Sequence, residues 1–165
     1  MPLEAIRTGT EEDARVIARL LRAAFGEQAR QLGFTRASNP RHPAFWSAER
    51  VRRAMRDGFS FLVLEADSRP AGCVAIRPGA PADEHGYLAR LAVLPQYRGR
   101  RYGELLVEFA ETALRDRGAR RVRLGVLGPL TSLQDWYRRQ GYVLVASEDE
   151  GGVVRVVWME KPLAG

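Results

Sequence analysis

The sequence is poor in the residues that build cross-links, metal sites and membrane spans. Its 165 residues include one cysteine, one lysine and two histidines. A lone cysteine excludes a disulfide framework, and Cys73 has no Cys or His neighbour at metal-ligand spacing, so we expect no metal. No apolar run approaches the roughly 20 residues of a membrane-spanning helix, and the start lacks a secretory signal. These absences predict a cytoplasmic protein with no membrane partner, in which Cys73 is a buried apolar residue.

Because lysine is nearly absent, arginine carries almost all of the positive charge, and the formal net charge is +6. The guanidinium fork matches phosphate and carboxylate groups. Two explanations remain open, an anionic ligand such as a phosphorylated cofactor, or a solvated arginine-rich surface. The sequence shows no interleaved aromatic platform of the kind that stacks bases, so we expect no nucleic-acid partner.

Hydrophobic periodicity and turn residues predict one domain over residues 1–165. The expected strands cover residues 3–7, 59–65, 71–77, 85–94, 121–127, 142–147 and 153–159, and the expected helices follow Thr10 and cover 44–56, 103–117 and 131–140. Thr10 and Asp13 are spaced for a capping box, and Gly26 is expected to end the first helix. Residues 26–43 are then the longest irregular stretch.

Strand, helix and strand over residues 85–127 imply a parallel pair, because such a crossover joins parallel neighbours. The segments 59–77 and 142–159 are expected to be antiparallel hairpins. Within the helix over 103–117, the apolar face is expected to comprise Leu105, Leu106, Phe109, Ala113 and Leu114. The predicted fold is α/β (α+β), a mixed and mostly antiparallel sheet of about six to seven strands with helices on both faces.

A basic, glycine-containing turn joins the strand over 85–94 to the following helix. Gly99 and Gly103 permit a tight turn and close approach of a ligand to the backbone. The first N–H groups of the helix have no partner within the helix and are suited to phosphate oxygens. Arg98, Arg100 and Arg101 add charge, so either a phosphate-binding turn or an ordinary turn with surface arginines fits the pattern.

Three motifs lie in and after this segment. Residues 91–95 have the pattern L-x-V-x-P, residues 96–101 have the pattern Q-x-x-G-x-R, and Trp136 to Tyr142 have the pattern aromatic-Tyr-x-x-x-Gly-aromatic. Together they resemble the motifs of the GNAT (Gcn5-related N-acetyltransferase) superfamily. The family's turn signature is Q/R-x-x-G-x-G/A, so Arg101 stands in place of the usual small residue, and Leu130 and Leu133 stand where Asn and Ala often precede the third motif. The order of elements matches along nearly the whole chain.

This resemblance implies an acetyl-CoA site where the parallel strands splay apart. The pantetheine arm would add to the strand edge near Leu91 and Val93, and an N–H of Ala92 or Val93 would hold the developing oxyanion. The pyrophosphate would sit on the amides of the turn, whose residues are Arg98, Gly99, Arg100, Arg101, Tyr102 and Gly103.

The resemblance also implies that Tyr137 donates a proton to the departing thiolate, with core packing as the alternative. His85, Tyr87 and Glu84 are candidates for the base that deprotonates the amine. His85 and Tyr87 share one strand face with Leu91 and Val93 by period two, and histidine has the most suitable unperturbed pKa. Solvent could instead remove this proton.

The function expected from these motifs is N-acetyl transfer from acetyl-CoA to a primary amine of a small molecule. The alternatives are acetylation of a protein N-terminus or lysine, and a non-catalytic acyl-CoA-binding module. Acceptor choice is expected to depend on residues 26–43, the second helix and the final hairpin. The acidic residues 148–150 of that hairpin either form a solvated tip or attract a cationic acceptor.

Two further residues have predicted places in the fold. We expect His42 to lie on the surface and Trp46 to anchor the second helix to the core. The sequence leaves the oligomeric state open, and a homodimer is one possibility.

Overall fold

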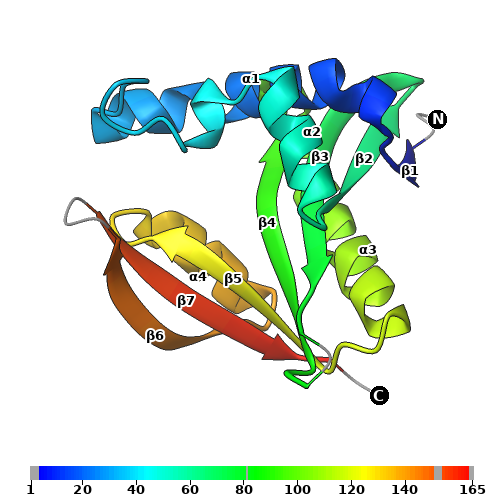
Figure 1. Cartoon of the computed structure of the whole chain (residues 1–165), viewed down its shortest axis with the longest axis vertical. Helices are drawn as coiled ribbons and strands as arrows, with labels where there is room; N and C mark the ends of the chain where they lie inside the picture. Colours follow the sequence, from blue (N-terminus) through cyan, green and yellow to red (C-terminus); the bar gives the residue numbers. More distant parts are fainter. Residues whose placement is uncertain (1–3, 81, 151–153, 164–165) are drawn as a thin grey trace. The chain divides into compact units, whose positions relative to one another are not determined.

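The computed structural model describes residues 4–80, 82–150 and 154–163, and it contains seven strands and four α-helices (Figure 1). The strands are β1 Glu4–Thr8, β2 Ser60–Ala66, β3 Arg69–Pro78, β4 His85–Val93, β5 Arg121–Leu127, β6 Val143–Glu150 and β7 Val154–Pro162. The helices are α1 Ala14–Leu32, α2 Ala48–Arg56, α3 Tyr102–Asp116 and α4 Thr131–Arg139. No helix in the described part of the chain is long and apolar enough to cross a membrane.

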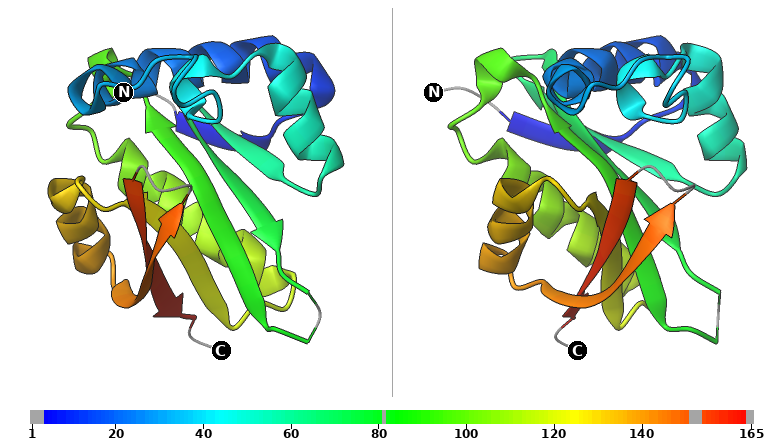
Figure 2. Two further views of the ribbon diagram at one scale, coloured as in Figure 1. Left: turned by 60° about the vertical axis from the view of Figure 1, so that its left-hand side comes forward. Right: turned by 90° about the vertical axis from the view of Figure 1, so that its left-hand side faces the viewer.

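The strands form one mixed sheet in the order β1-β2-β3-β4-β5-β7-β6. β4 and β5 are parallel, as the strand–helix–strand pattern predicts, and the hairpins β2–β3 and β6–β7 are antiparallel. β7 pairs with both β5 and β6, and β6 and β7 lie side by side in both views of Figure 2. The parallel ladder joins residues 85–87 to 121–123, whereas β5 continues to Leu127 and β4 to Val93.

The chain divides into two compact units, residues 1–76 with 90–110 and residues 77–89 with 111–165. The boundaries fall inside β3, β4 and α3, so each of these elements contributes to both units. A single domain over residues 1–165 remains a prediction.

In the first unit, helices cover both faces of the β2–β3 hairpin. Phe61, Val63, Cys73 and Ala75 alternate along the strands on one face and pack against buried residues of α1 and α2. The alternating residues Leu62, Leu64, Val74 and Ile76 are buried on the other face. Leu106 of α3 is on that second side, because its Cδ1 is 3.2 Å from where a Cβ on Gly72 would stand. Burial on both faces explains why these strands are apolar without interruption.

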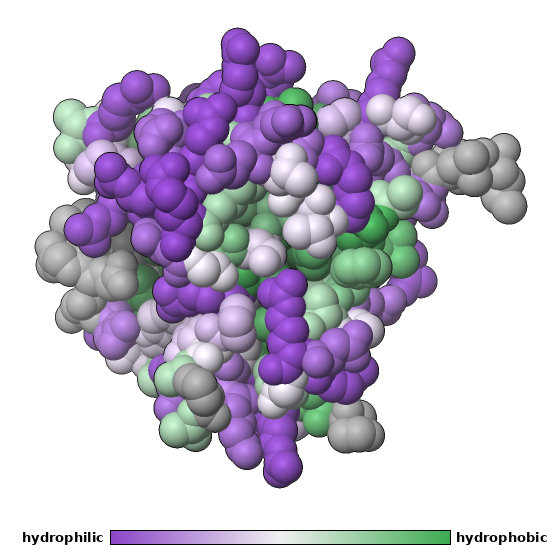
Figure 3. Space-filling view, turned by 45° about the vertical axis from the view of Figure 1, so that its right-hand side comes forward, coloured by the Kyte–Doolittle hydropathy of each residue, from purple (hydrophilic) through white to green (hydrophobic). Residues whose placement is uncertain are grey.

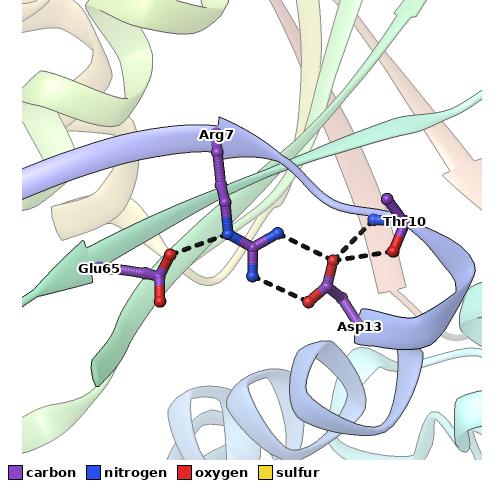
Figure 4. Close-up of polar contacts among 4 residues, drawn as sticks. All are labelled: Arg7, Thr10, Asp13 and Glu65. Atoms are coloured by element: carbon purple, nitrogen blue, oxygen red, sulfur yellow. Dashed lines mark hydrogen bonds and ion pairs between the residues drawn. The ribbon is translucent and has the colours of Figure 1, made fainter. Parts of the chain in front are cut away.

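Arg7 connects the first two strands to the start of α1 (Figure 4). Its Nε donates to Glu65 at 2.8 Å, and its terminal nitrogens donate to both carboxylate oxygens of Asp13 at 2.8 and 2.9 Å. The N–H of Thr10 donates to the same carboxylate at 2.7 Å, which completes the predicted capping box. The bidentate bond from Arg7 holds the pKa of Asp13 well below its usual range.

The first helix is longer than the sequence predicts. α1 passes through Gly26 and ends at Gly33, which has φ 71°. A glycine inside a helix costs only about 1 kcal/mol, and here the turn after it buries Ala29. The irregular stretch therefore begins at residue 33, and the second helix begins at Ala48 behind a Ser47 cap, preceded by a separate 3₁₀ turn Pro43–Phe45.

The apolar face of α3 also differs from the prediction. Leu106, Val107, Ala110 and Leu114 are buried, whereas Leu105 and Phe109 are 37% and 43% exposed. The buried stripe also includes Glu111, which the predicted apolar face does not contain.

In the second unit, Val122, Leu124 and Val126 are buried at alternate positions of β5, which agrees with the strand predicted over residues 121–127. Leu114 packs against Gly86 of β4 so closely that an added Cβ would lie 2.7 Å from Leu114 Cδ2. The expected turn over residues 148–152 is replaced by continuation of β6 to Glu150, and residues 151 and 152 lie outside the described part of the chain.

Candidate functional site

The basic turn of the first unit presents a row of main-chain donors. The N–H groups of Tyr97 and Arg98 donate to Leu94 and Pro95 carbonyls at 2.9 and 3.3 Å, and that of Leu105 donates to Arg101 at 3.1 Å. Between them, the N–H groups of residues 99–103 donate to no carbonyl of the described residues. Gly99 has φ 80°, a conformation that glycine adopts without strain. The turn can therefore receive an anion on its backbone at the positive end of α3.

The three arginines of the turn flank these donors in different ways. Arg98 folds back, with Nε 3.4 Å from the Val93 carbonyl and one terminal nitrogen 3.3 Å from the Ala24 carbonyl. The Cζ of Arg100 is 5.4 Å from the centre of the Tyr97 ring. Arg101 adopts φ 64° and pairs with Glu104 at 3.1 Å. All three are exposed, so their charge faces solvent beside the open amides.

The strand before the turn contains an irregular residue. Arg90 has φ 55° inside β4. Burial nevertheless keeps one alternation along the strand, because Leu88 and Ala92 are buried on either side of Arg90. The common face of His85, Tyr87, Leu91 and Val93 stays a prediction.

β3 lies unusually close to the second half of β4. A Cβ on Gly72 would stand 2.6 Å from the Ala92 carbonyl oxygen, so only glycine fits here without displacing β4. The Leu94 N–H donates to the Ala71 carbonyl at 2.9 Å. Cys73 is fully buried beside this segment, as predicted, and burial raises the pKa of its thiol to about 12.

His42 is buried, which contradicts its predicted place on the surface. Its Nδ1 accepts from the Ala44 N–H at 3.2 Å, so the neutral ring carries its proton on Nε2 and donates to Gln28 at 2.8 Å. Burial lowers the pKa of His42 to about 4, and the charge of Arg90 acts in the same direction. Both ring nitrogens are used to hold the chain, so His42 is structural. Trp46 is a buried core residue, as predicted.

In the second unit, Tyr137 projects from α4 into a group of aromatic rings. The residue is 5% exposed, and its ring makes edge contacts with Trp136 at 5.1 Å and Tyr142 at 5.7 Å between centroids. Burial raises the pKa of Tyr137, so the hydroxyl is protonated at neutral pH. Its hydroxyl has no hydrogen-bond partner within the described residues, and the hydroxyl oxygen is not fully buried. This leaves the hydroxyl free to bond to a ligand or to water.

A buried polar cluster lies next to Tyr137. The Tyr142 hydroxyl donates to Glu111 at 2.9 Å, and Lys161 donates to the other carboxylate oxygen at 3.0 Å. Burial and the charge of Glu111 both raise the pKa of Tyr142. Glu111 was not among the predicted site residues, although its spacing is a signal: it lies four residues after Val107 and three before Leu114, which are both buried on the same helix face.

The candidate bases lie at the start of β4, each with a partner. His85 Nε2 is 3.6 Å from Glu160, a carboxylate that also faces Arg121 and Arg123 at 3.7 and 3.6 Å. Arg77 lies over the Tyr87 ring at 5.3 Å, and Glu84 pairs with Arg120 at 3.6 Å.

The predicted site residues fall into two groups. The nine predicted cofactor-binding residues, 91–93 and 98–103, all belong to the first unit. Tyr137, His85 and Tyr87 belong to the second.

Comparison with known proteins identifies the family. The family model described as the acetyltransferase (GNAT) family matches residues 27–142. A search of curated protein sequences finds no match. The fold resembles that of PaiA N-acetyltransferase from Thermoplasma acidophilum, crystallised with coenzyme A, at 22% identity and a TM-score of 0.77, over 97% of this chain and 99% of that one.

Two further structures have the same fold. The ribosomal-protein-alanine N-acetyltransferase of Brucella melitensis is 20% identical with a TM-score of 0.70, and the match covers 96% of this chain and 99% of that one. The ribosomal-protein-S18-alanine N-acetyltransferase of Escherichia coli is 15% identical with a TM-score of 0.76, and the match covers 99% of this chain and 96% of that one. Because the family model spans more than half of the sequence, the chain belongs to the GNAT family of acetyltransferases.

Proposed function

We propose that this acetyltransferase moves the acetyl group of acetyl-CoA to a primary amine of a small molecule. The observation that carries the proposal is the row of open N–H groups over residues 99–103, flanked by three exposed arginines at the start of α3. A diphosphate is the group that such a row binds best, because backbone donors, helix dipole and guanidinium charge all favour it.

The residues of the first unit hold the cofactor in this proposal. The diphosphate of CoA lies on the amides of residues 99–103, and the pantetheine arm pairs with the strand edge at Leu91 and Val93. Either Ala92 or Val93 donates its N–H to the thioester oxygen, where negative charge develops during attack.

The chemical step transfers one acetyl group without a covalent enzyme intermediate. The amine loses a proton, to His85, Tyr87, Glu84 or solvent, and its lone pair attacks the thioester carbonyl carbon. The nitrogen of the tetrahedral intermediate releases a second proton to solvent as the intermediate expels the CoA thiolate, and Tyr137 donates its hydroxyl proton to the sulfur. The products are the N-acetylated amine and free CoA, and solvent returns the proton to Tyr137.

Acetylation of a protein N-terminus is the second candidate, because two structures with this fold are named as ribosomal-protein-alanine N-acetyltransferases. The third candidate is an acyl-CoA-binding module without turnover. These candidates differ in what they acetylate, so one experiment separates them.

The test offers acetyl-CoA with a panel of small primary amines and, in parallel, with peptides that begin with alanine, and it follows release of the CoA thiol. Binding of acetyl-CoA is measured by calorimetry in the same preparation. Release with small amines supports the proposal, and release with peptides alone favours the second candidate. Binding without release favours the third candidate, and failure to bind any acyl-CoA contradicts the proposed role of residues 99–103.

A further inference from the structure

Three arginines converge on Trp46 in the first unit. The guanidinium carbons of Arg50 and Arg90 lie 4.7 and 4.8 Å from the centre of the indole ring. Arg22 donates to the main-chain carbonyl of Trp46 at 2.9 Å. Trp46 is 4% exposed, and its indole N–H donates to the Arg41 carbonyl at 2.8 Å, so the ring that supports these cations is fixed.

The cluster holds like charges close together. Arg50 and Arg90 both lie within 5 Å of one ring centre, so their guanidinium carbons are less than 10 Å apart. Two like charges repel at that separation, and salt screens the repulsion only in part, because the separation is about the Debye length at physiological ionic strength. Among the described residues, no carboxylate pairs with Arg50, and the carboxylate of the same helix, Glu49, pairs with Arg52 and Arg56 instead. An anion bound here would relieve the repulsion.

Arg50 keeps its donors for such a ligand. It is partly exposed, and its guanidinium donates to no acceptor within the described residues. A guanidinium presents up to five N–H groups in a planar fork that matches a carboxylate or a phosphate.

The position of Arg90 ties this cluster to the proposed acetyl site. Arg90 immediately precedes residues 91–93, so at about 3.3 Å per residue its Cα lies within roughly 10 Å of each of theirs. Its φ of 55° is a conformation that costs a non-glycine residue of the order of 1 kcal/mol, and such residues concentrate at functional sites. Two further charges, on Arg50 and Arg22, come from α2 and α1, the elements beside the loop expected to choose the acceptor.

We infer that the acceptor is an anionic amine: a primary amine whose carboxylate or phosphate group binds Arg50 and Arg90 beside Trp46 while its amino group reaches the thioester. The inference rests on the proposed acetyl transfer to a small molecule and specifies its substrate class. The acid group is ionised in solution, so it can bind the guanidinium groups and thereby place the nitrogen.

The first test compares matched amines that differ in one group. The panel contains ω-amino carboxylates of two to six carbons, their carboxamides and 2-aminoethyl phosphate, each with acetyl-CoA and thiol release as the readout. We expect at least one anionic member to exceed its neutral counterpart at least tenfold in kcat/KM, and Arg50→Gln to reduce that ratio to about one. Arg53→Gln, an exposed arginine on the same helix, is the matched control and should preserve the ratio. The carboxylate and phosphate arms identify which anion is preferred.

The second test needs no turnover. In the complex with CoA, the side-chain Nε–H resonances of Arg50 and Arg90 should shift and saturate on titration with the amino carboxylates or 2-aminoethyl phosphate, and should not shift with the carboxamides. Arg50→Gln assigns the Arg50 resonance by deleting it. Equal kcat/KM for charged and neutral amines, or no shift with any anion, would overturn the inference while leaving the proposed acetyl transfer in place. An absence of turnover with every amine would instead contradict the transfer, and the resonances would still decide whether the anion site exists.

Discussion

The basic turn at residues 98–103 and the polar cluster around Glu111 use charge in opposite ways. In the turn, arginines are exposed and the groups offered to a ligand are main-chain N–H donors. In the cluster, Glu111 and Tyr142 are buried, and side-chain atoms bond to one another. Hydrophilic residues cover much of the face drawn in Figure 3, whereas a buried charged side chain is rare in folded proteins unless it is paired. A backbone site should tolerate loss of one side chain, whereas a buried cluster should not.

The largest expected effect concerns the hydroxyl next to the cluster. Tyr137→Phe removes the proposed proton donor and keeps the ring that packs on Trp136 and Tyr142, so kcat should fall about 100-fold, a loss typical of general acids. The Kd for CoA should remain within twofold. Thiol release and calorimetry measure the two quantities, and an unchanged kcat would show that the thiolate obtains its proton elsewhere.

Breaking the buried ion pair should cost more stability than breaking an exposed one. Glu111→Gln leaves the ammonium of Lys161, which is 29% exposed, without its counter-charge, and we expect a loss of about 2–3 kcal/mol in the free energy of unfolding. Arg101→Gln removes a pair whose arginine is 82% exposed, and should cost less than about 0.5 kcal/mol. Urea denaturation compares the two, and equal losses would remove the proposed distinction between the regions.

Burial of a titratable group should also make the stability of the protein depend on pH, and His42 is such a group. The pKa of His42 is about 4 in the folded protein and about 6.5 when unfolded, so the unfolded chain binds more protons between these values. The stabilisation is complete above pH 6.5 and is lost as the pH falls toward 4. We expect the wild-type protein to lose about 1–2 kcal/mol more than His42→Phe between pH 7.5 and pH 5. Denaturation curves at the two pH values give this difference, and parallel losses would argue that His42 is already charged when folded.

The smallest effect tests whether the turn binds through its backbone. Gly99→Ala forces an alanine into φ 80°, at a cost of about 1 kcal/mol, and should raise the Kd for acetyl-CoA about fivefold. Arg100→Ala removes only an exposed charge and should raise it about twofold. Calorimetry in one buffer is sufficient, and the reverse order would mean that side chains, not amides, provide the affinity.

Local signals predicted most of the fold. The strand predicted over residues 121–127 has the same bounds as β5, because both the alternation of apolar residues and the flanking glycine indicate a strand of this length. The parallel pairing also followed from local sequence, since a crossover helix of this length permits little else. The expected end of α1 at Gly26 was wrong because tertiary contacts, such as burial of Ala29, outweigh the weak preference of one glycine.

The site was only partly predictable. Motif spacing predicts that residues 91–103 and Tyr137 belong to the site, which stays a prediction, but the φ of Arg90 and the burial of His42 depend on residues distant in sequence. Gln28, Ala44 and the aromatic rings around His42 come together only after folding. Periodicity predicted Leu105 and Phe109 on the apolar face and did not predict burial of Glu111, because it assigns positions by hydrophobicity. The hydrogen bonds from Tyr142 and Lys161 satisfy the buried carboxylate.

If the bound thioester is acetyl-CoA, the scarcity of cysteine and lysine limits the number of side chains that the thioester could acylate. Thiols and ε-amines are the side chains that thioesters acylate most readily, and the chain has one of each. Cys73 is buried, and burial keeps its thiol neutral. Lys161 donates to Glu111, and its nitrogen has no lone pair for attack as long as it is protonated. The folded enzyme thus exposes few competing nucleophiles of its own and is protected against self-acylation by the reagent it carries.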